Sequence, residues 1–281
     1  ELAAQHLQTT PDLLQINQGV IFIKDHPQQK VSYAQLTKGK RIEKHLREKP
    51  PIKHYSKHTI CGRQVNRLDV PDKVTGKAKY AGDLRFPGML YAKIVRPPVH
   101  GAQKKQADVS AARRVEGVQI VQEGDLVAVL HELPDEAERA LAMVKAEFNL
   151  PDTNMDNESI YRHLLKTAAP AQVETQAGDL EQVKKLADRT CEARYFNQYV
   201  AHATTETHSA VARIDGNRVE VWASTQAPFR AQTEVAQALG LPPKDVHILT
   251  PFVGGGFGGK NRNQQVVEAA RLAKLTGKPV Q

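Results

Sequence analysis

The segment from Phe252 to Asn261 constrains this chain more than any other, because five glycines surround one phenylalanine in the sequence FVGGGFGGKN. A β-rich run ends at Val253, and a helical pattern follows the segment. Glycine lacks a Cβ, so its backbone can approach a ligand closely. At a strand-to-helix junction, free N–H groups point at an anion on the helix N-terminus. The segment therefore predicts an anion-binding loop, and the question is which anion it holds.

The composition is that of a soluble globular protein, with 281 residues of which 40% are apolar and 25% charged. A chain of this length forms roughly two domains. The net charge of +8 suits phosphate-bearing ligands, nucleic acid or an acidic partner, and selects none of them. Cys61 and Cys191 lie too far apart for a metal-binding motif, so we expect two free thiols. The sequence contains no apolar run of the roughly 18 residues that span a membrane.

Residues 1–60 predict a partial N-terminal segment followed by a linker. Helical patterns at 2–7 and from Tyr33, with Ser32 as its cap, flank a strand at 20–24. This is too little apolar material for an independent domain. Residues 41–60 are basic and polar and contain Pro50-Pro51, as is typical of a linker.

Residues 61–150 predict a small α+β domain, because several short strands accompany one good helix. We expect strands at 77–80, 90–95 and 126–130, with turns at Gly82-Asp83 and Pro87-Gly88. Pro134 opens a helix whose apolar face comprises Ala137, Ala140, Leu141, Val144 and Phe148.

Residues 151–178 are polar and irregular and predict a connector, and residues 179–281 predict a further α+β domain. The second stretch begins with a helix at 180–187 and a hairpin that joins 208–214 to 218–222. A helix at 228–239 stops at Gly240, a strand runs over 246–253 into the glycine segment, and a last helix stops at Gly277.

Two common nucleotide-binding motifs fit the glycine segment by count alone. Gly254, Gly256 and Gly259 match G-x-G-x-x-G, but no acidic residue follows the next helix, as a dinucleotide-binding unit requires. Gly254 to Lys260 matches the phosphate loop G-x-x-x-x-G-K, but Asn261 replaces the Ser or Thr that would hold magnesium. Both interpretations are therefore disfavoured.

The glycine segment resembles the glycine-phenylalanine loop of the molybdenum-binding subunit of the xanthine oxidase family. The surrounding motifs have the same order: VWASTQ at 221–226, a helix, LGLP at 239–242, and a strand into the loop. Upstream, HATTETHSA at 202–210 is similar to the family's H-x-x-x-E-P-H-x-A, with Thr207 in place of proline.

Residues 61–150 resemble the family's a/b hammerhead domain independently. The motifs that carry this resemblance are KVTGKAKY at 73–80, GD at 82–83, PGMLYA at 87–92, RPP at 96–98 and GDLVAV at 124–129. The region 63–74 and the stretch before it look closest to the branch of isoquinoline oxidoreductases, nicotinate dehydrogenases and membrane-associated aldehyde dehydrogenases. The expected fold is thus α+β: a hammerhead domain plus the first part of a molybdenum cofactor-binding domain, over 179–281.

The resemblance implies an oxidoreductase that oxidises an aldehyde or a nitrogen heterocycle, with water as the oxygen source. It implies a molybdenum-pterin cofactor, as molybdopterin cytosine dinucleotide, and [2Fe-2S] clusters on a partner subunit or domain. The implied partners are a small iron–sulfur subunit, the remainder of the same molybdenum subunit and a cytochrome or flavin acceptor, with no nucleic acid. The compartment stays open between cytoplasm and periplasm, peripheral to the membrane in the aldehyde dehydrogenase branch.

The resemblance also assigns cofactor-binding roles to Gly255, Gly256, Phe257 and Gly258, and makes Phe257 one wall of the substrate pocket. A phenyl ring gains about 0.5–1.5 kcal/mol beyond burial when it packs on a planar aromatic group. The alternative is that Phe257 only fills a gap in the core.

The remaining candidates are polar. Gln226 is assigned to the cofactor and Thr225 to the pocket, with helix capping as the alternative for Thr225. His202 and Glu206 have i, i+4 spacing within a strand-like pattern, and family members hold molybdenum through the pterin sulfurs, so we favour packing over metal ligation. Lys260 is expected either to meet a phosphate or to be solvated.

The family's general base is a glutamate far downstream of the loop, and no glutamate of this chain fits that role. We therefore expect no catalytic residue here, and we expect these residues to be an inactive internal fragment of a longer subunit. A naturally split subunit is the competing explanation for a fragment. The alternative function is a non-catalytic binding or assembly module that keeps the fold without the cofactor.

Overall fold

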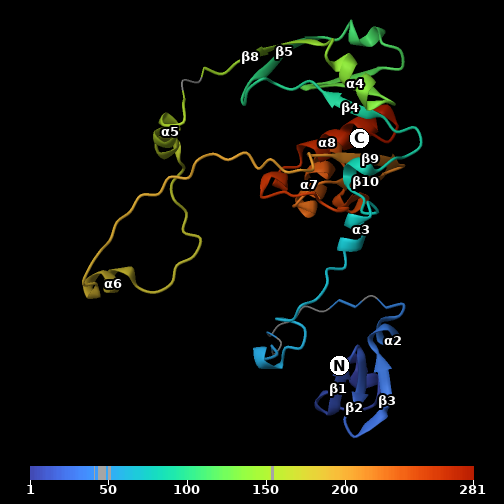
Figure 1. Ribbon diagram of the computed structural model, residues 1–281, viewed down its shortest axis with the longest axis vertical. Helices are drawn as coiled ribbons and strands as arrows, with labels where there is room; N and C mark the ends of the chain where they lie inside the picture. Colours follow the sequence, from blue (N-terminus) through green and yellow to red (C-terminus); the bar gives the residue numbers. More distant parts are fainter. Residues whose placement is uncertain (41, 44–48, 50–51, 153–154) are drawn as a thin grey trace. The chain divides into compact units, whose positions relative to one another are not determined.

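The computed structural model describes residues 1–40, 42–43, 49, 52–152 and 155–281. These residues divide into two compact units, Glu1–Arg67 and Leu68–Gln281 (Figure 1). Among the described residues, none of the helices has both the length and the apolar character needed to cross a membrane.

The first unit is built on an antiparallel sheet of order β1-β2-β3, with core residues Ala3, Ile21, Val31 and Leu36. Its elements are α1 (Leu2–His6), η1 (Pro11–Leu13), β1 (Leu14–Asn17), β2 (Val20–Ile23), β3 (His26–Ser32), α2 (Tyr33–Thr37) and η2 (Tyr55–Lys57). Both predicted helices and the strand at 20–24 are confirmed, whereas β1 and β3 were not predicted. Ser32 caps α2 as predicted, since its Oγ accepts from the Gln35 N–H at 3.1 Å. Much of the predicted linker lies outside the described residues.

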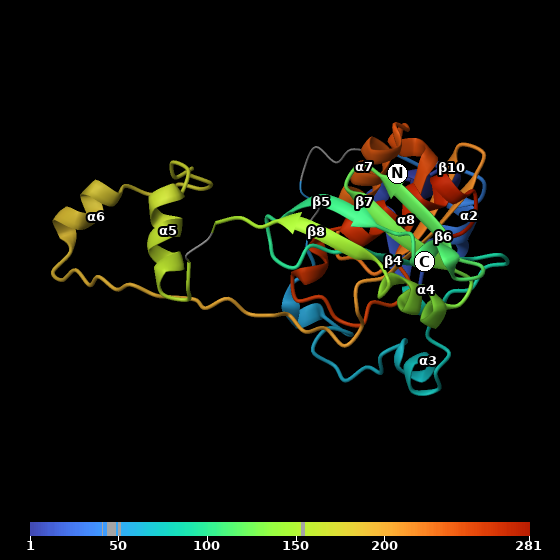
Figure 2. The ribbon, with the colours of Figure 1, turned by 90° about the horizontal axis from the view of Figure 1, so that it is seen from above.

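The second unit begins with a sheet of order β4-β7-β6, in which β7 is central and buried (Figure 2). Its elements are α3 (Val70–Val74), η3 (Ala81–Asp83), β4 (Tyr91–Ile94), β5 (Gln103–Asp108), η4 (Ala112–Arg114), β6 (Gln119–Glu123), β7 (Leu126–His131), α4 (Pro134–Leu141) and β8 (Lys145–Asn149). Strands β5 and β8 form a separate antiparallel ribbon. The buried side chains of Ala140 on α4 and Val129 on β7 lie in one small core cluster.

Two predictions for this part are wrong. Residues 77–80 form no strand, because Tyr80 pairs with Phe252 only through an isolated bridge. Helix α4 ends at Leu141, and Phe148 belongs to β8 instead. From Lys145 to Asn149 exposed and half-buried residues alternate, so the period of two characteristic of a strand replaces the helical period.

The stretch 151–209 contains α5 (Ser159–Thr167) and α6 (Leu180–Leu186), both largely exposed. Helix α6 confirms the pattern at 180–187. Helix α5 lies within the stretch predicted to be irregular. The polar residues on either side of this helix favoured the prediction of a connector.

The C-terminal part packs α8 against β9 and β10, and α7 against α8 and β11 (Figure 1). Its elements are β9 (Ala210–Asp215), β10 (Arg218–Ala223), α7 (Pro228–Leu239), η5 (Pro243–Asp245), β11 (Val246–Leu249), η6 (Gly259–Asn261) and α8 (Gln264–Thr276). The sheet has the order β11-β10-β9, with β10 antiparallel to β9 and parallel to β11. The hairpin and both helices are confirmed. The last strand is shorter than predicted, and Pro251 has no N–H with which to continue it.

Residues Pro279 to Gln281 join the two larger sheets of this unit. The Leu90 N–H donates to the Pro279 carbonyl at 2.9 Å on one side, and Val280 and Ala212 exchange hydrogen bonds on the other. Side chains of β4, β7, β9, β10, α7 and α8 accordingly share one core cluster. The loop between β11 and α8 is thus held on a single packed body.

Helix α7 supplies a first prediction. Gly240 ends the helix with φ +67°, a conformation that costs an ordinary residue about 1–2 kcal/mol. Gly240→Ala should lower the free energy of unfolding by that amount in a urea titration. Gly240→Asn should lower it less, because asparagine tolerates this conformation. Equal losses for the two variants would contradict the explanation, since no atom lies within 4 Å of the added Cβ.

Candidate functional site

The glycine loop, residues 254–259, lies between β11 and α8 and is anchored at its entry. The Phe252 N–H donates to the Lys79 carbonyl at 3.1 Å. The sequence predicted that the loop leads directly into a helix whose N-terminus would bind an anion, and the structure differs at this end of the loop. The 3-10 turn Gly259–Asn261 intervenes before α8 begins at Gln264, so the loop tip is not the first turn of α8.

At two loop positions a side chain could be added only by displacing a neighbouring side chain that lies close to the backbone. A Cβ on Gly254 would lie 2.5 Å from the Cβ of Glu206. A Cβ on Gly256 would lie 2.4 Å from Oε1 of Gln226. The glycines therefore serve contacts within the protein as well as any contact with a ligand.

Gln226, predicted to bind the cofactor, has its side chain hydrogen-bonded to the glycine loop. Its Oε1 accepts from the N–H groups of Gly258 at 3.0 Å and Lys260 at 3.3 Å. Its own N–H donates to the Lys260 carbonyl at 3.0 Å. Since Oε1 is occupied, the Gln226 amide presents its NH₂ group outward, and that group donates to none of the described residues.

The loop tip presents further unused donors. The N–H groups of Gly255, Gly256 and Phe257 donate to no group in the described part of the chain, although Gly256 is buried. Phe257 has φ +52° and is 73% exposed. A positive φ is unfavourable for phenylalanine, and such conformations cluster at functional sites. Phe257 does not fill a core gap.

Lys260 contradicts both expectations for it. The side chain is fully buried, and Nζ lies 2.7 Å from Oε2 of Glu206, so it is neither solvated nor directed at an external phosphate. This geometry also contradicts the phosphate-loop alternative, in which the lysine must reach the ligand. The pairing joins residues 54 positions apart in the chain.

Thr225, His202 and Glu206 have structural contacts. The Thr225 hydroxyl donates to Oδ1 of Asn263 at 2.6 Å and accepts from the Ala227 N–H at 3.0 Å. The His202 ring packs beside Gly259, whose added Cβ would lie 3.2 Å from it. The described residues contain no group of three or more His, Cys, Asp or Glu side chains arranged to hold a metal.

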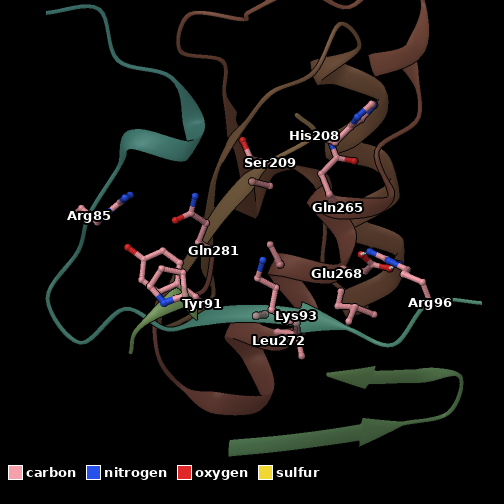
Figure 3. A pocket seen from close by; sticks show the side chains of 15 residues that line it. Arg85, Tyr91, Lys93, Arg96, His208, Ser209, Gln265, Glu268, Leu272 and Gln281 are labelled. Carbon is pink, nitrogen blue, oxygen red and sulfur yellow. Dashed lines mark hydrogen bonds and ion pairs between the residues drawn. The ribbon is translucent and has the colours of Figure 1, made fainter. Parts of the chain in front are cut away.

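A separate pocket of about 470 Å³ lies between β4, β9 and α8 (Figure 3). None of the five predicted cofactor residues lines it. Its wall includes Arg96, which contacts Glu268 through two hydrogen bonds of 2.5 and 2.6 Å. These bonds raise the pKa of Arg96 above its usual value, so its guanidinium stays charged. Arg96 belongs to the RPP motif, and no sequence pattern links it to Glu268, which lies 172 positions further along the chain.

Comparison with known proteins matches the C-terminal half of the chain to a protein family. The family described as "Molybdopterin cofactor-binding domain" matches residues 138–281. Its match covers the glycine loop, Gln226 and both helices that support them.

The curated relatives are longer than this chain. The B subunit of nicotinate dehydrogenase of Pseudomonas putida is 26% identical over 99% of the chain and 24% of that protein. The beta subunit of isoquinoline 1-oxidoreductase of Brevundimonas diminuta is 30% identical over 82% of the chain and 31% of that protein. The chain thus spans about a quarter to a third of the length of these relatives.

Solved structures establish the fold. Quinoline 2-oxidoreductase from Pseudomonas putida has a TM-score of 0.59 and 22% identity, covering 78% of this chain and 34% of that one. Aldehyde oxidoreductase from Desulfovibrio desulfuricans has a TM-score of 0.61 and 21% identity, covering 79% and 30%. The α+β fold class and the resemblance are confirmed: the chain belongs to the family of molybdopterin cofactor-binding domains found in molybdenum-binding subunits of the xanthine oxidase type.

Proposed function

We propose that this chain supplies one wall of a molybdenum-pterin site in an oxidoreductase that oxidises an aldehyde or a nitrogen heterocycle. The family and the names of the relatives support this proposal. The substrate class is a proposal, because the chain spans 24% and 31% of those two relatives.

One observation carries the proposal: the loop tip offers three successive unused N–H groups beside the outward NH₂ of Gln226. Neighbouring donors without an acceptor fit a group with acceptor oxygens. A molybdenum centre and a phosphorylated pterin both present acceptor oxygens. The residues present therefore fit the cofactor that the family name implies. When bound, this group would supply the redox chemistry by taking two electrons from the substrate, with water as the oxygen source.

The chain's own residues would bind and orient. Gly255, Gly256 and Phe257 would hold the cofactor through their unused N–H groups, and Gln226 would donate from Nε2. Gly258 would contribute indirectly, because its N–H donates to Oε1 of Gln226 at 3.0 Å. We assign Glu206 a structural role rather than that of the general base, because its Oε2 accepts three hydrogen bonds inside the protein and its Oε1 is buried away from solvent. We assign the base to no residue of this chain.

The finer cofactor and partner assignments belong to the same proposal. We propose that the pterin carries cytosine dinucleotide, whose pyrophosphate would suit backbone N–H groups without an acceptor. We propose that [2Fe-2S] clusters on a small partner subunit or domain receive the electrons and pass them to a cytochrome or flavin. The remainder of the same molybdenum subunit would complete the site.

Metal and nucleotide analysis tests the proposal. The protein, isolated from its own host with any natural partners, should contain about one molybdenum per chain, and acid treatment should release a pterin with cytidine monophosphate. Release of the pterin alone would restrict the cofactor to its mononucleotide form. An active preparation without molybdenum would overturn the proposal and favour the non-catalytic module.

Phe257 gives a prediction about the substrate. Phe257→Ala should raise KM for an aromatic aldehyde about tenfold, because the lost ring contact is worth about 0.5–1.5 kcal/mol on top of burial. The melting temperature should barely change, since the ring is mostly exposed. Phe196→Ala removes a ring of 61% exposure from the stretch between α6 and β9 and should leave KM unchanged. Equal KM values for Phe257→Ala and the unaltered protein would remove Phe257 from the substrate pocket.

A further inference from the structure

The base of the glycine loop converges on one carboxylate oxygen. Oε2 of Glu206 accepts from the Gly254 N–H at 2.7 Å, from Nζ of Lys260 at 2.7 Å and from the Ser224 hydroxyl at 2.9 Å. Gly254 opens the loop and Lys260 follows its last glycine. We call these four residues, Glu206, Ser224, Gly254 and Lys260, the loop clasp. One atom thereby fixes both ends of the loop.

Backbone contacts reinforce the clasp at each end. The Glu206 N–H donates to the Gly254 carbonyl at 3.2 Å, so these two residues bind each other in both directions. At the other end, the Gln226 backbone N–H donates to the Lys260 carbonyl, and the Lys260 N–H donates to Oε1 of Gln226. The position of Lys260 therefore also sets the position of the Gln226 amide.

The clasp is buried. Lys260 and Ser224 are inaccessible to solvent, and the Glu206 side chain is 13% exposed. A buried ion pair gains little stability over an apolar pair of similar volume, because both charges lose their hydration. Such a pair does fix the relative positions of its two side chains, because an ammonium and a carboxylate must meet at hydrogen-bond distance. The clasp is therefore better explained by the geometry it imposes than by stability.

We propose that Glu206 and Lys260 are positioning residues that set the shape of the loop tip, and that Lys260 acts through the loop rather than on an anion. The part of this proposal that concerns cofactor loading rests on the proposed function. With the clasp closed, the unused N–H groups of Gly255, Gly256 and Phe257 are presented in a fixed arrangement. With the clasp open, the same groups would be mobile and would bind an acceptor less well.

Amide hydrogen exchange tests the clasp without the cofactor. The full-length protein is produced in medium without molybdate, and exchange is followed in the peptide that covers residues 254–260. Lys260→Met should accelerate exchange of this peptide at least tenfold. The double variant Glu206→Gln with Lys260→Met has no buried charge, and it should recover much of the melting temperature while the loop still exchanges fast.

The matched control is Glu268→Gln on α8, which removes the charge and one acceptor from the contact with Arg96 and leaves the clasp intact. It should lower the melting temperature without accelerating exchange at 254–260. If Lys260→Met does not fold, the double variant and Glu206→Gln carry the test. Exchange at 254–260 that stays unchanged in the clasp variants, or that rises equally in Glu268→Gln, would overturn the proposal.

Molybdenum content separates this proposal from the proposed function. With molybdate in the medium, the clasp variants should hold at least tenfold less molybdenum than the unaltered protein. Fast loop exchange with full molybdenum content would overturn the link between clasp and loading. An unaltered protein without molybdenum would contradict the proposed function, whereas the exchange result would still decide whether the clasp orders the loop.

Discussion

Gly256→Ala is expected to remove most of the bound molybdenum while the protein remains folded. The added Cβ would lie 2.4 Å from Oε1, 2.5 Å from Cδ and 2.9 Å from Cγ of Gln226. Because real Cβ atoms do not approach so closely, the Gln226 side chain must leave the loop. Its departure frees the N–H groups of Gly258 and Lys260 and removes the outward NH₂ group. Loss of such supporting contacts lowers metal affinity about 10- to 100-fold.

Metal analysis and a thermal melt, made on the same sample, measure this effect. The free energy of unfolding should fall by only about 1–2 kcal/mol, because Gln226 is exposed and two hydrogen bonds are lost. Gly82→Ala is the matched control, since its Cβ would meet its nearest neighbours at 3.7 and 3.8 Å, which is ordinary contact. Full molybdenum content in Gly256→Ala would show that neither Gln226 nor the close approach matters for loading.

The elements that carry the loop could be predicted because their patterns are local. Val219, Val221 and Ala223 alternate with less buried residues, so the hairpin follows from a period of two. In α7, Pro228 opens the helix and Gly240 closes it. The secondary-structure prediction failed where a strand-like segment had no neighbouring strand with which to pair. Lys77 to Tyr80 has the composition of a strand, but only Tyr80 finds a bridge.

The glycines of the site could also be predicted, but the contacts that shape it could not. Glu206 and Lys260 are charged residues, which on average lie at the surface, and nothing in their spacing indicates a buried pair. The orientation of the Gln226 amide depends on two N–H groups more than 30 positions away. Such contacts depend on the complete packing of β9, β10 and α8 around the loop.

The second large effect concerns Gln226, for which the structure distinguishes acceptor from donor. Oε1 is used inside the loop, so only Nε2 is available to a bound cofactor. Gln226→Glu keeps an oxygen that can accept from Gly258 and Lys260, and it replaces the outward donor by an acceptor. Turnover should therefore fall about 100-fold, the effect of removing one hydrogen-bond donor from a reacting site. Molybdenum content should fall much less than in Gly256→Ala.

Gln226→Met provides the contrast, because methionine is similar in length to glutamine but lacks both the Oε1 acceptor and the Nε2 donor. It should reduce molybdenum content as well as turnover, whereas Gln226→Glu should affect turnover per bound molybdenum. Measuring kcat and molybdenum on the same samples separates the two effects. If Gln226→Glu had the same kcat per bound molybdenum as the unaltered protein, donation from Nε2 would play no part in the reaction. The role of Gln226 would then be confined to the hydrogen bonds that its Oε1 accepts from the loop.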